Sequence, residues 1–297
     1  MNKIALFILY NHHYTKNIDR TENLYKGKFS YVFHLIPFYS GDRENVIPVY
    51  ESSIQFQSYI AQAYQKVKGL AFTHYFVVAD DMILNPQINE NNFFDITGIP
   101  QDASYITDVR DFYSHKFGIP LFENINTWGT EVMNILPSKE TAVNIMEKNN
   151  LAVLPSRWFA FKYLVHYLFK FKMEKVKHAM YYLVKYNQNN IYPALWSYSD
   201  IILIPNAYMD NFATYCGCLA ALNIFVEQAI PIALYLSSEN VVLGNEIKLK
   251  QITQLYNLGD KGQKDFEVKY GFSLNELLNN YPKDLFFVHP IKLSKWK

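Results

Sequence analysis

The sequence predicts an α/β protein with a mixed, mainly parallel central sheet flanked by helices. Short, continuous apolar runs, the pattern of strands buried on both faces, alternate with longer segments of helical spacing. One of these runs ends abruptly in two carboxylates, at the place where open α/β sheets bind ligands. No linker or repeat divides the chain, so we expect a single domain over residues 1–297.

The first third of the chain supplies the strand, helix, strand order of such a sheet. Residues 4–10, 31–37 and 75–79 are apolar runs and predict strands. Residues 11–28 predict a loop with a helix, and residues 51–67 carry apolar side chains at helical spacing. Because this order favours right-handed parallel crossovers, we expect the three strands to lie in one sheet.

The remaining elements follow the same reasoning. Residues 104–109, 131–136 and 201–204 predict strands. Ser138 is expected to cap a helix that follows it. Residues 211–236 predict a long buried helix with a break at Pro231, and a polar helical stretch is expected around residues 273–280.

A basic and aromatic segment predicts a helical insertion over about residues 155–187. Residues 157–185 contain seven Lys or Arg, one acid (Glu174) and many aromatic side chains. One interpretation is a packed helical hairpin with a solvated basic face. The other is an amphipathic surface that makes peripheral contact with anionic lipid or with a lipid-linked acceptor.

Composition narrows the class of protein. The formal net charge of +1 gives no strong field, so we expect no nucleic-acid partner. Cys216 and Cys218 are too few for a disulfide framework or a thiolate zinc site, which predicts reduced, buried thiols in a cytoplasmic protein. The apolar run at residues 4–10 is too short to span a membrane. Aromatic residues, Trp128 and Trp196 among them, are interpreted either as packing or as platforms for sugar rings.

The carboxylate pair is Asp80 and Asp81. Two adjacent carboxylates after a buried strand raise the pKa of at least one of them or recruit a cation. Mg²⁺ and Mn²⁺ prefer hard oxygen ligands and often bind one or two carboxylates together with the phosphates of a substrate. The alternative is a turn in which one of the two caps the next segment.

The stretch FVVADDMILNP at residues 76–86 resembles the DxD region of GT-A glycosyltransferases. That resemblance implies a GT-A (Rossmann-like) fold, a Mn²⁺ or Mg²⁺ cofactor, and a nucleotide-sugar donor. It also implies that Asp81 binds the metal and that Asp80 binds either the metal or the ribose of the donor. Ala79 stands where a third acid is often found, which leaves the division of labour between the two open.

The C-terminal tail carries a second resemblance. His289 and Lys295 keep the spacing of the HxxGxxKPW tail of glycogenin-like and lipopolysaccharide glycosyltransferases, although Lys292 replaces the glycine and no proline precedes Trp296. The resemblance implies that His289 completes the metal site and that Lys295, with Lys292, contacts the donor diphosphate. The alternative is a solvated basic tail with a surface histidine.

A third, looser similarity covers residues 192–234 and points to bacterial GT-A proteins of surface-glycan loci. Glu227, in an apolar run, is the first candidate for a base that deprotonates the acceptor, and Asp200 is the second. The alternatives are a salt bridge between Glu227 and a lysine, and a turn or helix cap at Asp200.

Together these resemblances imply a metal-dependent hexosyltransferase of bacterial surface polysaccharide synthesis. Its acceptor would be a glycan or a lipid-linked molecule, and it would be cytoplasmic, peripheral on the inner membrane face. Two rivals remain. One is a non-catalytic glycan- or nucleotide-binding protein of the same fold. The other is a metal-dependent nucleotidyltransferase, which would normally show a glycine-rich phosphate loop near the first strand. No such loop follows Tyr10.

Overall fold

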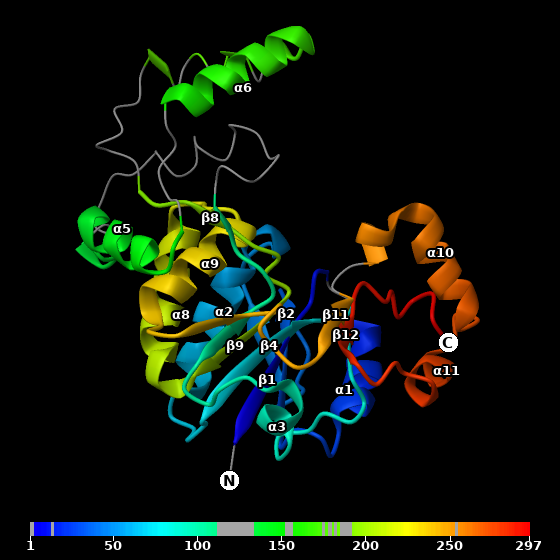
Figure 1. The fold of residues 1–297 in the computed structure, drawn as a ribbon. Coiled ribbons are helices and arrows are strands. Elements are labelled where there is room, and N and C mark those ends of the chain that lie inside the picture. The colour runs from blue at the N-terminus through cyan, green and yellow to red at the C-terminus, as the bar shows by residue number, and fades with distance from the viewer. Residues whose placement is uncertain are drawn as a thin grey trace.

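The computed structural model describes residues 3–12, 15–111, 134–151, 157–173, 176–177, 180, 183–184, 192–252 and 255–297 (Figure 1). Its centre is a seven-stranded sheet in the order β10-β6-β9-β4-β1-β2-β3. These strands are β1 (Ile4–Leu9), β2 (Tyr31–Pro37), β3 (Val46–Val49), β4 (His74–Ala79), β6 (Ser104–Ile106), β9 (Ile201–Pro205) and β10 (Val241–Leu243). The predicted class, a mainly parallel α/β sheet flanked by helices, is confirmed.

Strand direction decides which residues meet at the edge of the sheet. β1 pairs in parallel with β2 and β4, β2 with β3, and β6 with β10. β9 runs antiparallel to both of its neighbours, β4 and β6. β9 therefore begins at the edge where the other strands end, and the backbone N–H of Ala79 donates to the carbonyl of Asp200 over 3.0 Å.

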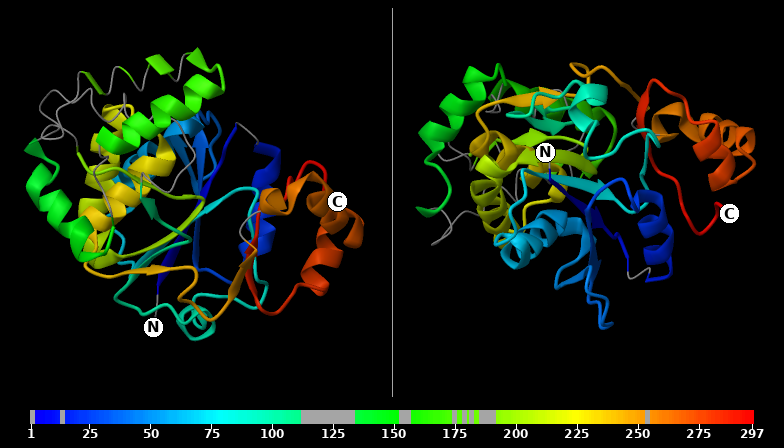
Figure 2. Two further views of the ribbon diagram at one scale, coloured as in Figure 1. Left: turned by 45° about the horizontal axis from the view of Figure 1, so that its top comes forward. Right: turned by 90° about the horizontal axis from the view of Figure 1, so that it is seen from below.

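Alternate residues of β1 face two separate cores. Ala5, Phe7 and Leu9 pack toward helices α2 (Phe56–Val67), α8 (Asn206–Ala221) and α9 (Val226–Ser237). Ile4, Leu6 and Ile8 pack toward α1 (Ile18–Tyr25) and the C-terminal elements. Figure 2 shows these helices on the two sides of the sheet. Because both faces are covered, the strands read as continuous apolar runs, which is why the sequence identifies them.

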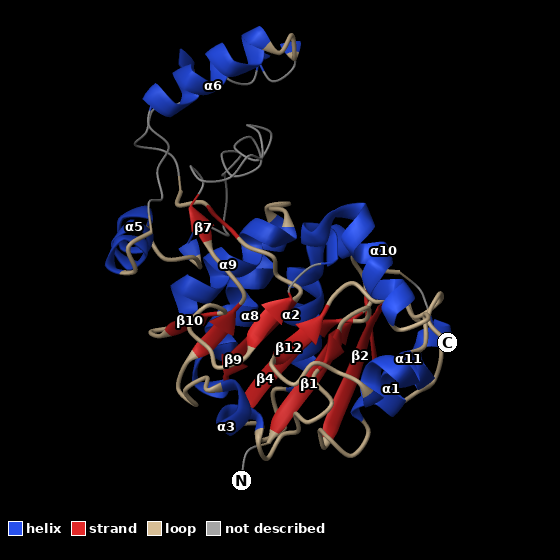
Figure 3. Ribbon diagram, turned by 45° about the vertical axis from the view of Figure 1, so that its right-hand side comes forward, coloured by secondary structure: helices blue, strands red, loops and turns tan. Residues whose placement is uncertain are grey.

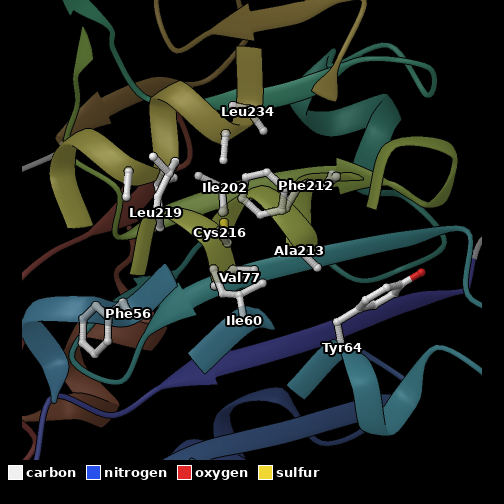
Figure 4. Close-up of a cluster of buried hydrophobic side chains, with 14 of the residues drawn as sticks. Phe56, Ile60, Tyr64, Val77, Ile202, Phe212, Ala213, Cys216, Leu219 and Leu234 are labelled. Atoms are coloured by element: carbon white, nitrogen blue, oxygen red, sulfur yellow. The ribbon is translucent and has the colours of Figure 1, made fainter. Parts of the chain in front are cut away.

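The predicted helix at residues 211–236 is wrong in its boundaries. The chain forms α8 and α9 with a turn at residues 222–225, where Asn223 has a left-handed φ of 56°. Pro231 lies inside α9 and does not break it. Figure 4 shows the resulting core, in which Phe212 and Cys216 of α8 lie between β-strand and α2 side chains. Cys216 and Cys218 are buried free thiols, as predicted.

Two small sheets complete the strand inventory of the described residues. The first has the order β11-β12-β5, from β11 (Lys250–Ile252), β12 (Leu285–Val288) and β5 (Ile83–Leu84). The second pairs β7 (Arg110–Asp111) with β8 (Leu195–Trp196). The other helices are α3 (Phe93–Thr97), α5 (Lys139–Lys148), α6 (Arg157–Phe169), α10 (Gly259–Lys269) and α11 (Leu274–Asn279), with 3-10 turns η1 (Thr15–Asn17), η2 (Ser53–Gln55) and η5 (Leu255–Leu258).

Other local predictions have mixed outcomes. Ser138 caps α5, as predicted, because its side chain accepts a hydrogen bond from the backbone of Thr141. The predicted strand at residues 131–136 is wrong for residues 134–136, which form a turn ahead of that cap, and its first three residues lie outside the described chain. Trp128 also lies outside it. No helix among the described residues combines the length and apolar composition that a membrane span needs.

Candidate functional site at the carboxyl edge of the sheet

Asp81 and His289 meet at the edge where β4 ends. β5 follows Asp81 and pairs antiparallel with β12 in the register Val288↔Ile83, so the residue after β12 lies next to the turn after β4. The Nε2 atom of His289 lies 3.0 Å from Oδ1 of Asp81. The backbone N–H of Ile291 also donates to the Asp81 carbonyl over 2.6 Å. The predicted meeting of the two distant chain segments is confirmed for this pair.

Charge around His289 favours its protonated form. Burial by itself lowers the pKa of this imidazole, whose residue is 8% exposed. The hydrogen bond to Asp81 and the charges of Asp200, Asp81 and Asp80 outweigh that effect and raise the pKa above its usual value. In the protein alone, the neighbouring carboxylates therefore favour the protonated imidazole. A metal ion would have to displace that proton to bind Nε2.

Asp80 has a different environment from its neighbour. The residue is 6% exposed, and its carboxylate lies near the loop after β1, where the backbone N–H of Asn11 donates to Oδ1 over 3.5 Å. Burial and then the charge of Asp81 raise its pKa to about 7, and hydrogen bonds from Asn11 and Asn17 lower it in part. The structure therefore places Asp81 toward His289 and Asp80 toward the β1–α1 loop.

The C-terminal tail is anchored, not loosely solvated. The guanidinium of Arg20, on α1, donates to the carbonyl oxygens of Leu293 and Trp296, the second over 2.8 Å. Trp296 is 1% exposed, and its ring lies about 6 Å from the rings of Phe266 and Phe272. The surface histidine of the alternative interpretation is wrong, since His289 is buried. Lys292 and Lys295, in contrast, are exposed.

Asp200 lies directly before β9 and beside His289. Its Oδ2 atom is 3.9 Å from Nδ1 of the imidazole. Both residues line a small pocket together with Met82, Thr107, Tyr198, Ile201 and Phe287. Burial by the surrounding protein raises the pKa of Asp200, whose side chain is still 32% exposed at the pocket. The charge of His289 lowers this pKa in part, and the charge of Asp81 raises it.

Glu227 is held by an indole instead of a lysine. Nε1 of Trp196 donates to Oε2 of Glu227 over 2.9 Å, so the predicted salt bridge with a lysine is wrong within the described residues. Trp196 is 2% exposed in β8 and packs in the interior, not in a loop. Burial and then the charge of Asp200 raise the pKa of Glu227 to about 7, and the indole hydrogen bond lowers it in part.

Pro231 accounts for the position of Glu227 relative to β8. A helical carbonyl normally accepts from the N–H four residues later, and Pro231 has no N–H to donate to Glu227. The Glu227 carbonyl instead accepts from the backbone N–H of Ser197 over 2.9 Å. This contact fixes the segment after β8 to the first turn of α9 and places Trp196 beside the carboxylate.

A larger cavity, missed at the sequence level, lies beyond the ends of β1, β2 and β3. It has a volume of about 490 Å³ and is lined by Asn11, His12, Pro37, Phe38, Glu51, Ser52, Ser53 and Tyr59. The hydroxyl of Tyr59 is buried and has no hydrogen-bond partner among the described residues. The one sequence feature that points to this cavity is that polar residues follow each apolar run. Their convergence requires the strand order, which the sequence does not show directly.

Asp81 and His289 are a candidate pair of ligands for a divalent ion. Within the described chain, no three His, Cys, Asp or Glu side chains are grouped as a metal site. Asp81 and His289 nevertheless lie 3.0 Å apart, which is about the separation of two adjacent ligands at roughly 2.1 Å in an octahedral shell. Mg²⁺ and Mn²⁺ commonly take one or two protein ligands and complete the shell with substrate phosphates and water.

No protein-family model matches the sequence, and a comparison with characterised proteins finds no relative. The functional argument therefore depends on the geometry of the site.

Proposed function

We propose that this protein is a metal-dependent glycosyltransferase of the GT-A type, which moves a hexose from a nucleotide-sugar donor to a glycan or lipid-linked acceptor. One observation carries the proposal. Three binding features follow one another along the carboxyl edge in strand order: the cavity at β3, β2 and β1, the Asp81–His289 pair at β4, and Asp200 at β9. A nucleoside, a diphosphate and a sugar are joined in that same order.

The nucleoside of the donor is assigned to the cavity beyond β1–β3. Its volume of about 490 Å³ lies in the range of small-molecule sites. The ring of Tyr59 forms part of the cavity wall. Phe38 and Tyr50, at 61% and 67% exposure, form an exposed edge-to-face pair beside the cavity, where a planar base can stack. We assign to Asp80, near Asn11, the acceptance of a hydrogen bond from a ribose hydroxyl.

The diphosphate is assigned to Asp81 and His289. When bound there, Mn²⁺ or Mg²⁺ would neutralise charge that develops on the departing nucleoside diphosphate. The carboxylate of Asp81 and the deprotonated Nε2 of His289 would hold the ion, and Asp200 beside Nδ1 would orient the ring. The exposed ammonium groups of Lys295 and Lys292 lie on the anchored tail, where they can contact the phosphates.

Glu227 is assigned the role of base if the enzyme inverts the anomeric centre. In an in-line displacement the base and the leaving group stand on opposite sides of the reacting carbon. Asp200, 3.9 Å from His289, belongs to the leaving-group side. Glu227 lies at the start of α9 beside Trp196 of β8, and a pKa of about 7 suits proton abstraction near neutral pH.

The proposal is tested by thermal shift with UDP, GDP, CDP and ADP, each with and without Mn²⁺. We expect one nucleoside diphosphate to raise the melting temperature only with the metal, because a ligand that binds the native state stabilises it. Asp81→Asn should abolish the metal-dependent shift. Asp102→Asn, an exposed aspartate before β6, is the matched control and should keep it. A shift that is equal with and without Mn²⁺, or that survives in Asp81→Asn, contradicts the assignment.

The released product separates the rival functions. A transferase releases nucleoside diphosphate from its sugar donor, a nucleotidyltransferase releases pyrophosphate from a nucleoside triphosphate, and a binding protein releases neither. Ala79, in place of a third acid, is the feature that favours the non-catalytic rival. Donor turnover with Mn²⁺ that is lost in Glu227→Gln and in Asp81→Asn would support the transferase.

A further inference from the structure

Helix α6 presents an apolar stripe to solvent. Trp158, Phe161, Val165, Leu168 and Phe169 recur at spacings of three or four residues and therefore share one face of the helix. Trp158 is 63% exposed and Phe169 is 82% exposed. The rings of Trp158 and Phe161 stack with their centroids 5.7 Å apart, so the stripe has a continuous aromatic surface.

Two other residues of α6 pack against the protein. Tyr167 is buried, and Leu164 contacts the core that lies under α8 and α9. The apolar residues thus surround the helix and are not limited to its inner face. Complete packing is wrong for α6, because part of its apolar surface is exposed, and contact of this segment with lipid stays a prediction.

The turn after α6 extends this surface. The N–H of Phe171 donates to Leu168 over 3.1 Å, and the N–H of Lys172 donates to Tyr167 over 3.2 Å, which is a Schellman helix end. Phe171 adopts a left-handed φ of 51° and is 88% exposed. Glycine is the residue favoured at this position, so Phe171 supplies an outward aromatic ring at some conformational cost.

Positive charge accompanies the exposed rings. Lys162, Lys170, Lys172 and Lys177 are exposed, and no Asp or Glu lies among the described residues between 157 and 184. The Nζ atom of Lys162 lies 5.6 Å from the Trp158 ring. Aromatic rings and lysines together are the side chains that lie at the boundary between water and an anionic lipid bilayer.

We propose that α6 and the turn at Phe171 bind the surface of an anionic lipid bilayer. The exposed lysines favour an anionic lipid surface over a second copy of this chain, because that copy has a net charge near zero and offers no excess of negative charge. With 13 residues, α6 is about 20 Å long and cannot cross a hydrocarbon core of about 30 Å, so it lies along the surface. In Figures 1 and 3 it lies beyond the edge where β1 and β4 end, and docking would bring the strand-end site toward the lipid.

The test is co-sedimentation of the full chain with vesicles, without nucleotide or metal, so its outcome is independent of the proposed transferase activity. Phosphatidylcholine vesicles that contain phosphatidylglycerol should bind the protein, and vesicles of phosphatidylcholine alone should not. Because each lysine near an anionic surface contributes about fivefold to binding, Lys162→Gln/Lys170→Gln/Lys172→Gln should weaken the partition at least about tenfold. Lys261→Gln/Lys264→Gln, two exposed lysines of α10, is the matched control and should change it less than about twofold.

A second variant guards against misfolding. Phe171→Gly suits the left-handed turn and should fold normally, yet it removes the most exposed ring and should weaken binding. The proposal is overturned if anionic vesicles do not bind the protein, or if the α6 and α10 variants lose binding equally. It is also overturned if Phe169→Ser changes the oligomeric state in size-exclusion light scattering, because the stripe would then be covered by a second copy.

Discussion

The strand-end site and the α6 surface are built in opposite ways. The site gathers Asp81, Asp200 and His289 from three separated parts of the chain, and backbone hydrogen bonds from Ile291 and Ala79 join those parts. The α6 surface comes from one short segment whose side chains point to solvent. Removal of a buried ring from the elements that carry the site should therefore be costly to the fold, whereas removal of an exposed ring from α6 should change the free energy of unfolding little.

Two tryptophans give the sharpest form of this comparison. Trp296→Ala should lower the free energy of unfolding by about 3–5 kcal/mol, because it leaves a cavity beside Phe266 and Phe272 in the anchored tail. Trp158→Ala, in the exposed stripe, should change it by less than about 0.5 kcal/mol. Urea unfolding of both variants measures the contrast. Equal losses would mean that α6 is as integral to the fold as the tail.

The next effect depends on pH and concerns Glu227. Its pKa is about 7 in the folded protein against 4.5 for the free side chain, so the folded state holds the proton more tightly. The cost of its charge is absent below pH 4.5 and grows as the pH rises to 7. The free energy of unfolding of Glu227→Gln, compared with that of the parent, should therefore increase by about 2 kcal/mol from pH 4.5 to pH 8. This figure allows for the partial exposure of the Glu227 side chain.

Unfolding curves at the two pH values check this, since parent and variant share every other titration. Glu239→Gln, at an exposed position after α9, serves as the control and should show the same difference at both pH values. If the gap between Glu227→Gln and its parent did not widen with pH, the carboxylate would be solvated and unsuited to proton abstraction.

The smallest expected effect on stability has opposite signs at two positions near the end of α6. Phe171→Gly should raise the free energy of unfolding by up to about 1 kcal/mol, because it relieves a left-handed φ of 51°. Phe169→Gly, at the last residue of the helix, should lower it by up to about 1 kcal/mol, since glycine favours the unfolded chain. Thermal unfolding compares the two. A loss in both would show that the turn is not held as described.

Sequence reasoning succeeded where structure is encoded locally. The buried runs that became β1, β2 and β4, and the cap at Ser138, depend on neighbouring residues only. It failed where tertiary contacts decide. The break between α8 and α9 depends on how they pack, and the cavity beside Tyr59 depends on the strand order.

The site itself was predicted in part. The meeting of His289 with Asp81 came from a resemblance and not from any local pattern, and it is the contact that the structure contains. The sequence shows two identical adjacent residues, so it did not predict that Asp80 and Asp81 point in different directions. The direction of Asp80 depends on its contact with the loop at Asn11. Their roles in binding a donor stay predictions.

Pro231 has a consequence for how this chain could diverge. Any other residue at position 231 would restore an N–H that competes with Ser197 for the Glu227 carbonyl. A change four positions away from the carboxylate, and without contact to any ligand, could thus loosen the strand that carries Trp196. Pro231 thus couples α9 to the segment after β8, so its replacement would act first on the position of Trp196 beside the Glu227 carboxylate.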